Sequence, residues 1–315
     1  MAYFNYGIWS LVGQQLTFQI ATTFIMFFTV QWRPKLLFSY HRFKELFDYG
    51  WKILLSNLLT TFFLNIRSLI IGKMYSPQML AFFDKGKQFP SIIMTNINSS
   101  IQSVLFPAYS AEQDNRIRVR NMVRRSIKTS SFIIFPLMIG LAVTAKPIVI
   151  VLLTEKWLPA VPFIQIFCAT YMLMPIHSAN MEAIKALGYS NYILKNEIAK
   201  KTIEFVILVI SLFFGIYAIA FGALISNIIS LAINSYPNIK LLQYNYIEQL
   251  KDVLPSLIIS IIMGIFVYLL KYINMSTVAI LSLQIILGVN IYMGLSYLFK
   301  VESLSYIINI IKSKK

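Results

Sequence analysis

The chain has 315 residues, of which 57% are hydrophobic and only 13% are charged. A soluble globular protein carries roughly 25% charged residues, and one soluble core of this length could not bury so much apolar surface. Together with a mean hydropathy of +0.68, this excludes a soluble enzyme, a disordered chain and a disulfide-stabilised domain. The sequence predicts an all-α polytopic membrane protein.

The formal net charge of +16 would also suit a nucleic-acid-binding protein. The basic residues, however, form short clusters between long uncharged runs, which is typical of the cytoplasmic loops of membrane proteins. No nucleic-acid partner is therefore expected. One cysteine (Cys168) and two histidines (His41 and His177) are too few for a site of Cys and His ligands, so we expect no disulfide, metal or cofactor.

About 20 mostly apolar residues are needed for a helix to cross the bilayer, and such runs predict about nine transmembrane helices. In chain order they occupy residues 7–30, 50–72, 88–110, 129–153, 159–181, 202–215, 217–237, 253–272 and 277–299. Pro136 and Pro175 lie inside spans and should kink them. Gly215 to Tyr217 should form a very tight turn between two spans.

The distribution of Lys and Arg predicts the orientation of these helices. One set of alternate loops, at 31–49, 111–128, 182–201, 238–252 and 300–315, holds 20 of the 28 basic residues, and the other set holds five. Basic loops stay in the cytoplasm. Nine spans then place the N-terminus outside and the C-terminus in the cytoplasm.

The first span and the segment after it have unusual features. Residues 1–32 contain no charge, so the basic region of a signal peptide is missing, and this start suits a helix from the middle of a longer protein. The segment 31–49 has apolar residues at helical spacings of 4, 3 and 4, namely Leu36, Tyr40, Phe43 and Phe47. It predicts an amphipathic helix in the headgroup plane.

Polar side chains recur on one face of several spans. The second span carries Asn57, Thr61, Asn65 and Ser68, the third Ser91, Thr95, Asn98 and Gln102, and the seventh Ser226, Ser230 and Asn234. Small and amide side chains of this kind can simply hold helices together. Two consecutive spans with long stripes favour the other interpretation, a shared water-accessible path.

Arg67 and Lys146 are cations at bilayer depth, where a charge costs about 2.5–3.5 kcal/mol on insertion scales and usually faces a cavity. Arg67 lies five residues before Gly72, the outer end of its predicted span. Its side chain could therefore extend toward the outer surface instead of facing a cavity. Because hardly any acidic residue accompanies these cations at bilayer depth, they favour binding of an anionic solute such as phosphate or pyrophosphate.

Charges near the cytoplasmic ends have a simpler interpretation. Glu204 is expected to pair with Lys200 or Lys201 at helical spacing. The run from Arg116 to Lys128 holds six basic residues, which mark topology and are expected to contact anionic membrane lipid.

No enzymatic activity is expected. The outer loops offer only Asp84 and Glu155 as acidic residues, each beside a lysine. No loop contains an aspartate pair, a Ser-His-Asp set or a glycine-rich phosphate loop. We therefore predict no catalytic residues.

Five sequence runs carry a resemblance to a known family. They are YGIWSLV at 6–12, LIIGKMYSPQMLAFF at 69–83, SVLFPAYSAEQDN at 103–115, EKWLPAVPF at 155–163 and IKALGYSNY at 184–192. Their order and spacing resemble the Wzx-type flippases for lipid-linked oligosaccharides, in the lipopolysaccharide and colanic acid exporter branch of the multidrug/oligosaccharidyl-lipid/polysaccharide superfamily. Ala81, Gly86 and Thr154 depart from the family's usual residues.

The resemblance implies a fold of two six-helix lobes followed by two extra helices. Residues 1–30 would be the sixth-helix remnant of the N-terminal lobe and 31–49 the interlobe linker. Residues 50–252 would be the C-terminal lobe, and 253–315 the two extra helices with a basic cytoplasmic tail. The first five helices of the family plan would then be absent from this sequence.

The function implied is translocation of an undecaprenyl-pyrophosphate-linked oligosaccharide across the bacterial inner membrane by alternating access, with membrane lipids and polysaccharide polymerase machinery as further partners. Among the residues, Arg67 is the first candidate for binding pyrophosphate and Lys146 the second. Asn57, Thr61, Asn65, Asn98 and Gln102 are candidates for lining the cavity and binding sugar hydroxyls.

Two alternatives stay open at this point. The chain could be a non-transporting fragment of such a flippase, since a cavity between two lobes needs both. Less favoured is a membrane polymerase or ligase of polysaccharide assembly, against which the missing outer-face carboxylate and histidine clusters argue.

Overall fold

The computed structural model describes residues 9–29, 39–40, 43–44, 47, 65–273 and 275–313. The chain forms two compact units, and the boundary between them falls between Thr61 and Phe62. The candidate residues Asn57 and Thr61 lie outside the described residues.

Helices make up nearly all of the described part of the chain, and no strand occurs in it. The first unit contributes α1 (Trp9–Thr29). The second unit contains a helical segment at 65–74, α3 (Pro77–Ala111), α4 (Arg116–Val143), α5 (Ala145–Leu153), the 3₁₀ helix η2 (Glu155–Ala160), α6 (Val161–Met172), α7 (Met174–Ala186), α8 (Ser190–Leu212), α9 (Ile216–Leu242), α10 (Tyr246–Leu269), the 3₁₀ helix η3 (Leu270–Tyr272), α11 (Thr277–Leu298) and α12 (Glu302–Ser313). The predicted all-α class is confirmed.

Within the described residues, five helical stretches are long and apolar enough to cross a membrane, judged by length and composition. They are Arg116–Val143, Glu155–Ala186, Ile216–Leu242, Tyr246–Tyr272 and Thr277–Leu298. A multi-pass membrane protein is thereby confirmed. The count of nine spans and the direction of the termini stay predictions.

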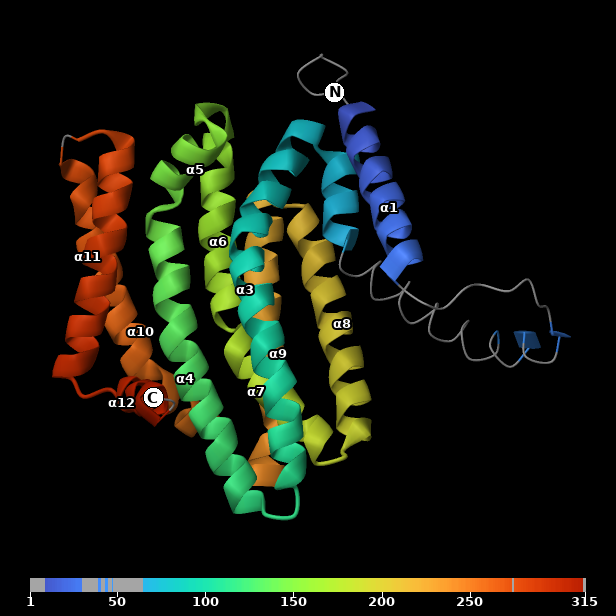
Figure 1. Cartoon of the computed structure of the whole chain (residues 1–315), viewed down its shortest axis with the longest axis vertical. Helices are drawn as coiled ribbons and strands as arrows, with labels where there is room; N and C mark the ends of the chain where they lie inside the picture. Colours follow the sequence, from blue (N-terminus) through green and yellow to red (C-terminus); the bar gives the residue numbers. More distant parts are fainter. Residues whose placement is uncertain are drawn as a thin grey trace. The chain divides into compact units, whose positions relative to one another are not determined.

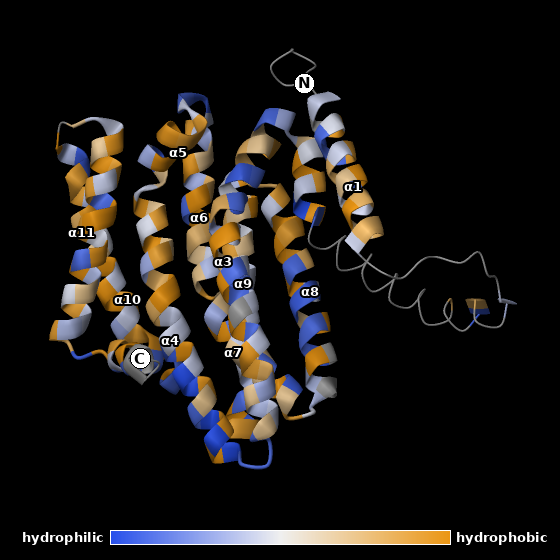
Figure 2. Ribbon diagram, in the orientation of Figure 1, coloured by the Kyte–Doolittle hydropathy of each residue, from blue (hydrophilic) through white to orange (hydrophobic). Residues whose placement is uncertain are grey.

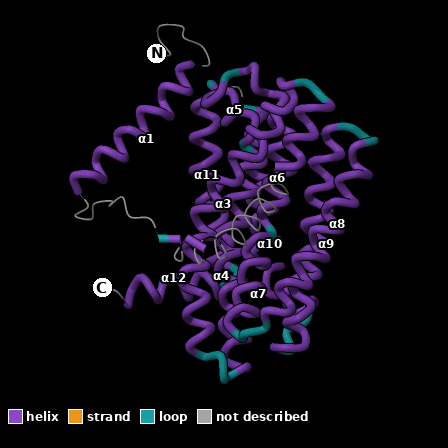
Figure 3. The backbone as a smooth tube through the Cα atoms, turned by 90° about the vertical axis from the view of Figure 1, so that its right-hand side faces the viewer, coloured by secondary structure: helices purple, strands orange, loops and turns teal. Residues whose placement is uncertain are grey.

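In the second unit, the long helices run up and down beside one another (Figures 1 and 3). The connections at 112–115, 187–189 and 243–245 lie at one end of the bundle, and those at 154–160, 213–215 and 270–273 lie toward the other. α10 packs along α4, α8 packs along α9, and α3 packs against α6 and α7. α12 differs, because it lies across the bundle axis, seen end-on in Figure 1 and from the side in Figure 3.

The helices extend beyond the predicted spans, so the loops are shorter than expected. Residues 77–87, expected in a loop, form the first turns of α3, which begins at Pro77 and is capped by Ser76, whose hydroxyl accepts from the Met79 amide at 3.2 Å. Both residue types favour a helix start. The predicted tail at 300–315 similarly contains α12. Many basic residues therefore project from helix ends instead of from loops.

Pro136 and Pro175 act differently in the predicted spans that contain them. The predicted span 159–181 is divided into α6 and α7 at Leu173, two residues before Pro175, because proline cannot donate a helical hydrogen bond. Pro136, in contrast, lies inside a continuous α4, and the break in that span comes at Thr144. The tight turn before α9 is confirmed, with Gly215 at a φ of 94° that favours glycine.

The contact between α3 and α6 leaves no space for a side chain at Gly86. A Cβ atom there would lie 2.3 Å from the Cβ of Phe163. One turn earlier, the Phe83 ring meets the rings of Phe163 and Phe167 edge-on, with centroids 5.7 and 5.2 Å apart. This aromatic cluster is part of a buried core.

Large apolar side chains remain exposed along the helices, for example Phe213 at 83% and Tyr297 at 76%. Figure 2 shows hydrophobic residues along the helix middles and hydrophilic residues concentrated around the connection of α3 to α4. Exposed apolar surface of this extent promotes aggregation in water. In a membrane, the acyl chains of the bilayer cover such a surface.

In the first unit, α1 is an apolar helix whose threonine hydroxyls bond the backbone carbonyl four residues earlier, as Thr17 does to Gly13 at 2.7 Å. Of the predicted amphipathic segment 31–49, only a few residues are described. The Phe43 and Phe47 rings stack with centroids 5.8 Å apart, as the helical spacing predicts. The rest of that segment lies outside the described residues.

Candidate substrate site

Arg67, on the helical segment 65–74, forms an ion pair with Glu204 of α8. Its Nη1 donates to Glu204 Oε1 at 2.8 Å, and its Nη2 donates to the Ser226 hydroxyl of α9 at 3.4 Å. The side chains of Arg67 and Glu204 are only 17% and 21% exposed. Together with Ser226, the partly buried pair therefore joins three helical segments.

Glu204 also interacts with a second cation. Lys201 Nζ donates to the other carboxylate oxygen of Glu204 at 3.0 Å, which confirms one of the two predicted partners. Lys200 pairs with Glu197 instead, at 2.5 Å. One carboxylate thus faces two cations, and the cluster keeps a net positive charge.

A cavity of about 210 Å³ opens beside this ion pair. It is lined by Arg67, Lys87, Phe167, Thr170, Tyr171, Glu204, Ala223, Ser226, Asn227 and Ser230. Within the described part of the chain, the buried Nε of Arg67 has no hydrogen-bond acceptor. Two cations, hydroxyls and an amide around one carboxylate suit a ligand that carries negative charge and many oxygen atoms.

A buried polar network connects the cavity wall to α7. His177 Nε2 lies 2.9 Å from Asn227 Oδ1, and Asn234 Nδ2 lies 3.0 Å from His177 Nδ1. These partners assign the proton of a neutral imidazole to Nε2, so that Nδ1 accepts. Since Asn227 also lines the cavity, the network includes part of the cavity wall.

The network continues toward the end of the bundle that holds the α9–α10 connection. Asn180 Nδ2 donates to Gln249 Oε1 at 2.9 Å and to the Ser235 hydroxyl at 3.2 Å, while Asn238 Nδ2 donates to Asn180 Oδ1 at 2.7 Å. These side chains are buried, and buried polar groups require such partners. The network therefore fixes the position of α7 relative to α9 and α10.

Most of this network was not predicted from the sequence. A signal was present, because Asn227, Asn234 and Asn238 are separated by 7 and 4 residues, which places them on one helix face. The run from His177 to Asn180 is likewise unusually polar for an apolar segment. Only Asn234 was included in a predicted stripe.

The other predicted site residues that the structure describes do not line the Arg67 cavity. Lys146 is exposed in the first turn of α5 and does not line the cavity. Asn65 is exposed on the segment of Arg67. Asn98 accepts a hydrogen bond from the Ser178 hydroxyl at 2.5 Å, so it holds α3 to α7, and Gln102 is half-buried one turn further along α3. Their roles toward a substrate stay predictions.

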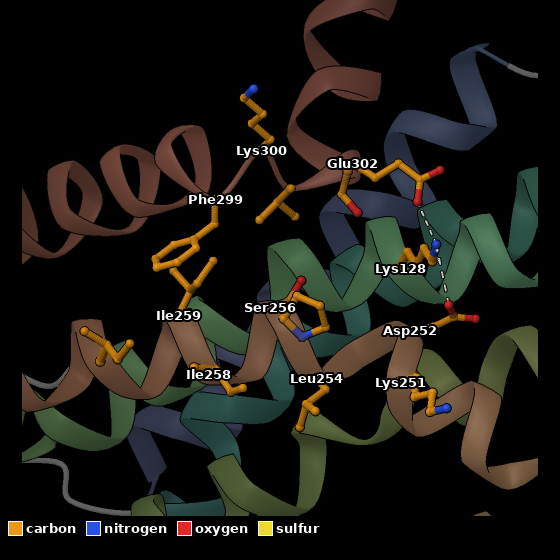
Figure 4. Close-up of a pocket in the computed structure, with 14 residues that line it drawn as sticks. Lys128, Lys251, Asp252, Leu254, Ser256, Ile258, Ile259, Phe299, Lys300 and Glu302 are labelled. Carbon is orange, nitrogen blue, oxygen red and sulfur yellow. Dashed lines mark hydrogen bonds and ion pairs between the residues drawn. The ribbon is translucent and has the colours of Figure 1, made fainter.

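The basic run on α4 forms ion pairs within the fold. Arg120 pairs with Glu248 at 2.9 Å, and Arg124 makes two hydrogen bonds to Asp252 at 2.8 and 2.9 Å. Lys128 lies between Glu302, at 2.6 Å, and Asp252, at 3.5 Å, as Figure 4 shows. These pairs join α4 to α10 and α12. The contact with anionic lipid predicted for this run remains a prediction.

Among the described residues, no group of three or more His, Cys, Asp or Glu side chains is placed to hold a metal ion. Cys168 is a buried free thiol. The side chains that line the Arg67 cavity offer charges and hydrogen-bonding groups to a ligand.

Comparisons with known proteins identify the family and the fold of the chain. The sequence profile of the polysaccharide biosynthesis protein family matches residues 1–162. The chain is 25% identical over 158 residues to the teichuronic acid biosynthesis protein TuaB of Bacillus subtilis, covering 50% of this chain and 33% of that protein. It is 33% identical over 178 residues to a membrane protein of the cps region of Klebsiella pneumoniae, covering 55% and 34%.

The lipopolysaccharide biosynthesis protein WzxC of Escherichia coli is 22% identical over 145 residues, covering 46% of this chain and 30% of that protein. The chain thus spans about a third of the length of these curated relatives. Among solved structures, the lipid II flippase MurJ in an inward closed conformation matches with a TM-score of 0.72 at 17% identity, covering 87% of this chain and 59% of that one. The fold is therefore shared with MurJ, and the predicted resemblance to Wzx-type proteins is confirmed.

Proposed function

Because the chain belongs to the polysaccharide biosynthesis protein family, we propose that it takes part in moving an undecaprenyl-pyrophosphate-linked oligosaccharide across the bacterial cytoplasmic membrane. The observation that carries the proposal is the partly buried Arg67–Glu204 pair beside a cationic cavity. A charge at bilayer depth is costly, and charged residues within membrane spans usually face a cavity and mark substrate pathways. The names of the relatives and the fold shared with MurJ support the same substrate class.

In this proposal, Arg67 exchanges one anionic partner for another. A pyrophosphate carries more charge than a carboxylate and offers oxygens to both nitrogens of the guanidinium fork. When the headgroup enters, Arg67 and Lys87 bind its phosphate oxygens, while Lys201 continues to neutralise Glu204. When the headgroup leaves, the pair between Arg67 and Glu204 forms again. Alternating access of the cavity to the two membrane faces would follow this exchange.

The proposed arrangement in the membrane keeps nine spans, with the N-terminus outside and the C-terminus in the cytoplasm. Residues 50–252 form the lobe that carries the site, and 253–315 form the added helices and tail. In support, the first half of α4, which holds its six basic residues, lies toward one end of the second unit. That end would be the cytoplasmic one.

Cysteine labelling tests this orientation. The native Cys168 is 1% exposed, so it gives little background. On intact spheroplasts, a membrane-impermeant maleimide should label Met275→Cys but not Asp114→Cys, and permeabilisation should expose the latter. Labelling of Asp114→Cys without permeabilisation would contradict the proposed direction.

Deletion of the gene in its own host tests the function. We expect loss of a surface polysaccharide and accumulation of its lipid-linked precursor, both reversed by the wild-type chain. Arg67→Ala should fail to restore export, while Lys271→Ala, which removes an exposed cation at the proposed outer end, should restore it. Export by Arg67→Ala at normal protein level would refute the site.

The same strains distinguish the alternatives. Unchanged export after deletion would indicate a non-transporting fragment. Transfer of sugar to a lipid-linked acceptor by the purified chain would indicate a polymerase or ligase.

A further inference from the structure

A second hollow lies between α10 and the turn that joins α11 to α12 (Figure 4). Its volume is about 540 Å³, and none of its lining residues lines the Arg67 cavity. Leu254, Ile258 and Ile262 of α10 and Phe299 after α11 form much of its wall. Ile258 and Phe299 are 47% and 68% exposed, so the crevice has an accessible apolar surface.

The charges at this crevice are unevenly compensated. Its carboxylates are already paired, Asp252 with Arg124 and Glu302 with Lys128. Lys251 on α10 and Lys300 in the α11–α12 turn are exposed, and neither has a carboxylate within ion-pair distance in the described part of the chain. The rim therefore keeps two positive charges that the fold does not neutralise.

The position of α12 sets the depth of the crevice in the membrane. α12 lies across the axis of the membrane-spanning helices (Figures 1 and 3). Val301 and Leu304 are buried against Ile259 and Tyr292 of the spanning helices. An amphipathic helix in this arrangement lies in the headgroup plane. The crevice beside it thus opens where lipid phosphates meet acyl chains.

We propose that this crevice binds one anionic phospholipid. The phosphate lies between Lys251 and Lys300, whose flexible stems reach a phosphate as point charges, and one acyl chain runs along Ile258, Ile262 and Phe299. A zwitterionic lipid gains the apolar contacts but presents its own cation to the rim. The site thus selects for headgroup charge. This inference does not rest on the proposed transport function.

Binding is measured on the purified full-length chain by native mass spectrometry in detergent, with phosphatidylglycerol and phosphatidylcholine titrated separately. We expect a preference for phosphatidylglycerol. In the double variant Lys251→Gln/Lys300→Gln, affinity for phosphatidylglycerol should fall about 30-fold, which corresponds to about 2 kcal/mol for two lysines near a lipid surface. Lys195→Gln, at another exposed lysine on α8, should leave binding unchanged.

Arginine at both rim positions should retain the preference, because charge is the recognised property. Equal binding of the two lipids by the wild-type chain would overturn the proposal, as would an equal loss in Lys195→Gln. Undecaprenyl phosphate serves as a third probe. Tight binding of that lipid at Lys251 and Lys300 without binding of phosphatidylglycerol would assign the crevice to a substrate lipid and refute the inference.

Discussion

Exchanging the charges of Arg67 and Glu204 separates a structural role of Arg67 from a role in substrate binding. Arg67→Glu alone places two carboxylates side by side, and Glu204→Arg alone removes the carboxylate from a cluster of cations. The double variant restores an ion pair of opposite direction. If Arg67 only holds helices together, the double variant should recover both stability and export.

The size of the effect follows from the exposure of the pair. Side chains that are 17% and 21% exposed lie between surface pairs, worth about 0–1 kcal/mol, and buried pairs, whose disruption costs about 3–5 kcal/mol. We expect each single change to lower the free energy of unfolding by about 2 kcal/mol after allowance for solvent screening. For a unit of this size that corresponds to a fall in Tm of about 4–8 °C.

Thermal unfolding of the purified chain in detergent measures the change in stability, and polysaccharide export in the deletion host measures the change in function. We expect the double variant to regain most of the lost Tm but not to restore export, because a carboxylate at position 67 repels pyrophosphate. Full export by the double variant would refute direct binding by Arg67. A Tm that the exchange does not restore would mean that the two side chains are not coupled.

Two further predictions concern packing and pH. Gly86→Ala should lower Tm, because overpacking costs about 1–3 kcal/mol while the gain in helix propensity is only about 1 kcal/mol. The control is Gly294→Ala, where nothing lies within 4 Å of an added Cβ, and this variant should keep or raise Tm. A Gly86→Ala protein as stable as the wild type would contradict the close contact. Lys128 beside Glu302 lowers the pKa of that carboxyl, so its contribution to holding α12 is present at neutral pH and is lost as pH falls through the lowered value. The hydrogen-exchange protection of α12, corrected for the intrinsic pH dependence of amide exchange, should therefore fall at low pH in the wild-type chain but not in Glu302→Gln. Identical pH profiles of protection in the two proteins would exclude the contribution.

Features that depend on neighbours in sequence could be predicted from the residues. The interruption before Pro175 and the turn at Gly215 follow from backbone chemistry that one or two residues determine. The i,i+3 pair of Lys201 and Glu204 follows from helix geometry. Each needs no knowledge of how the helices pack.

Partners that are far apart in sequence could not be predicted. Arg67 and Glu204 are separated by 137 residues, and the six basic residues of α4 have the same composition whether they face lipid or carboxylates. Only packing of α10 along α4 shows that Arg124 reaches Asp252. The lengths of the loops were overestimated for a related reason. A helix with charged side chains can continue beyond the membrane into water, whereas the hydropathy of the sequence marks only the part of the helix inside the membrane.

The close approach at Gly86 limits how this unit can move. Where Gly86 of α3 lies against Phe163 of α6 with no space for a Cβ atom on the glycine, a sliding motion would force the α3 backbone into α6. The two helices should therefore travel as one rigid body. Bending is left to the points where the helices are interrupted, at Thr144 and Leu173. In the proposed alternating access, the unit would bend at these two points.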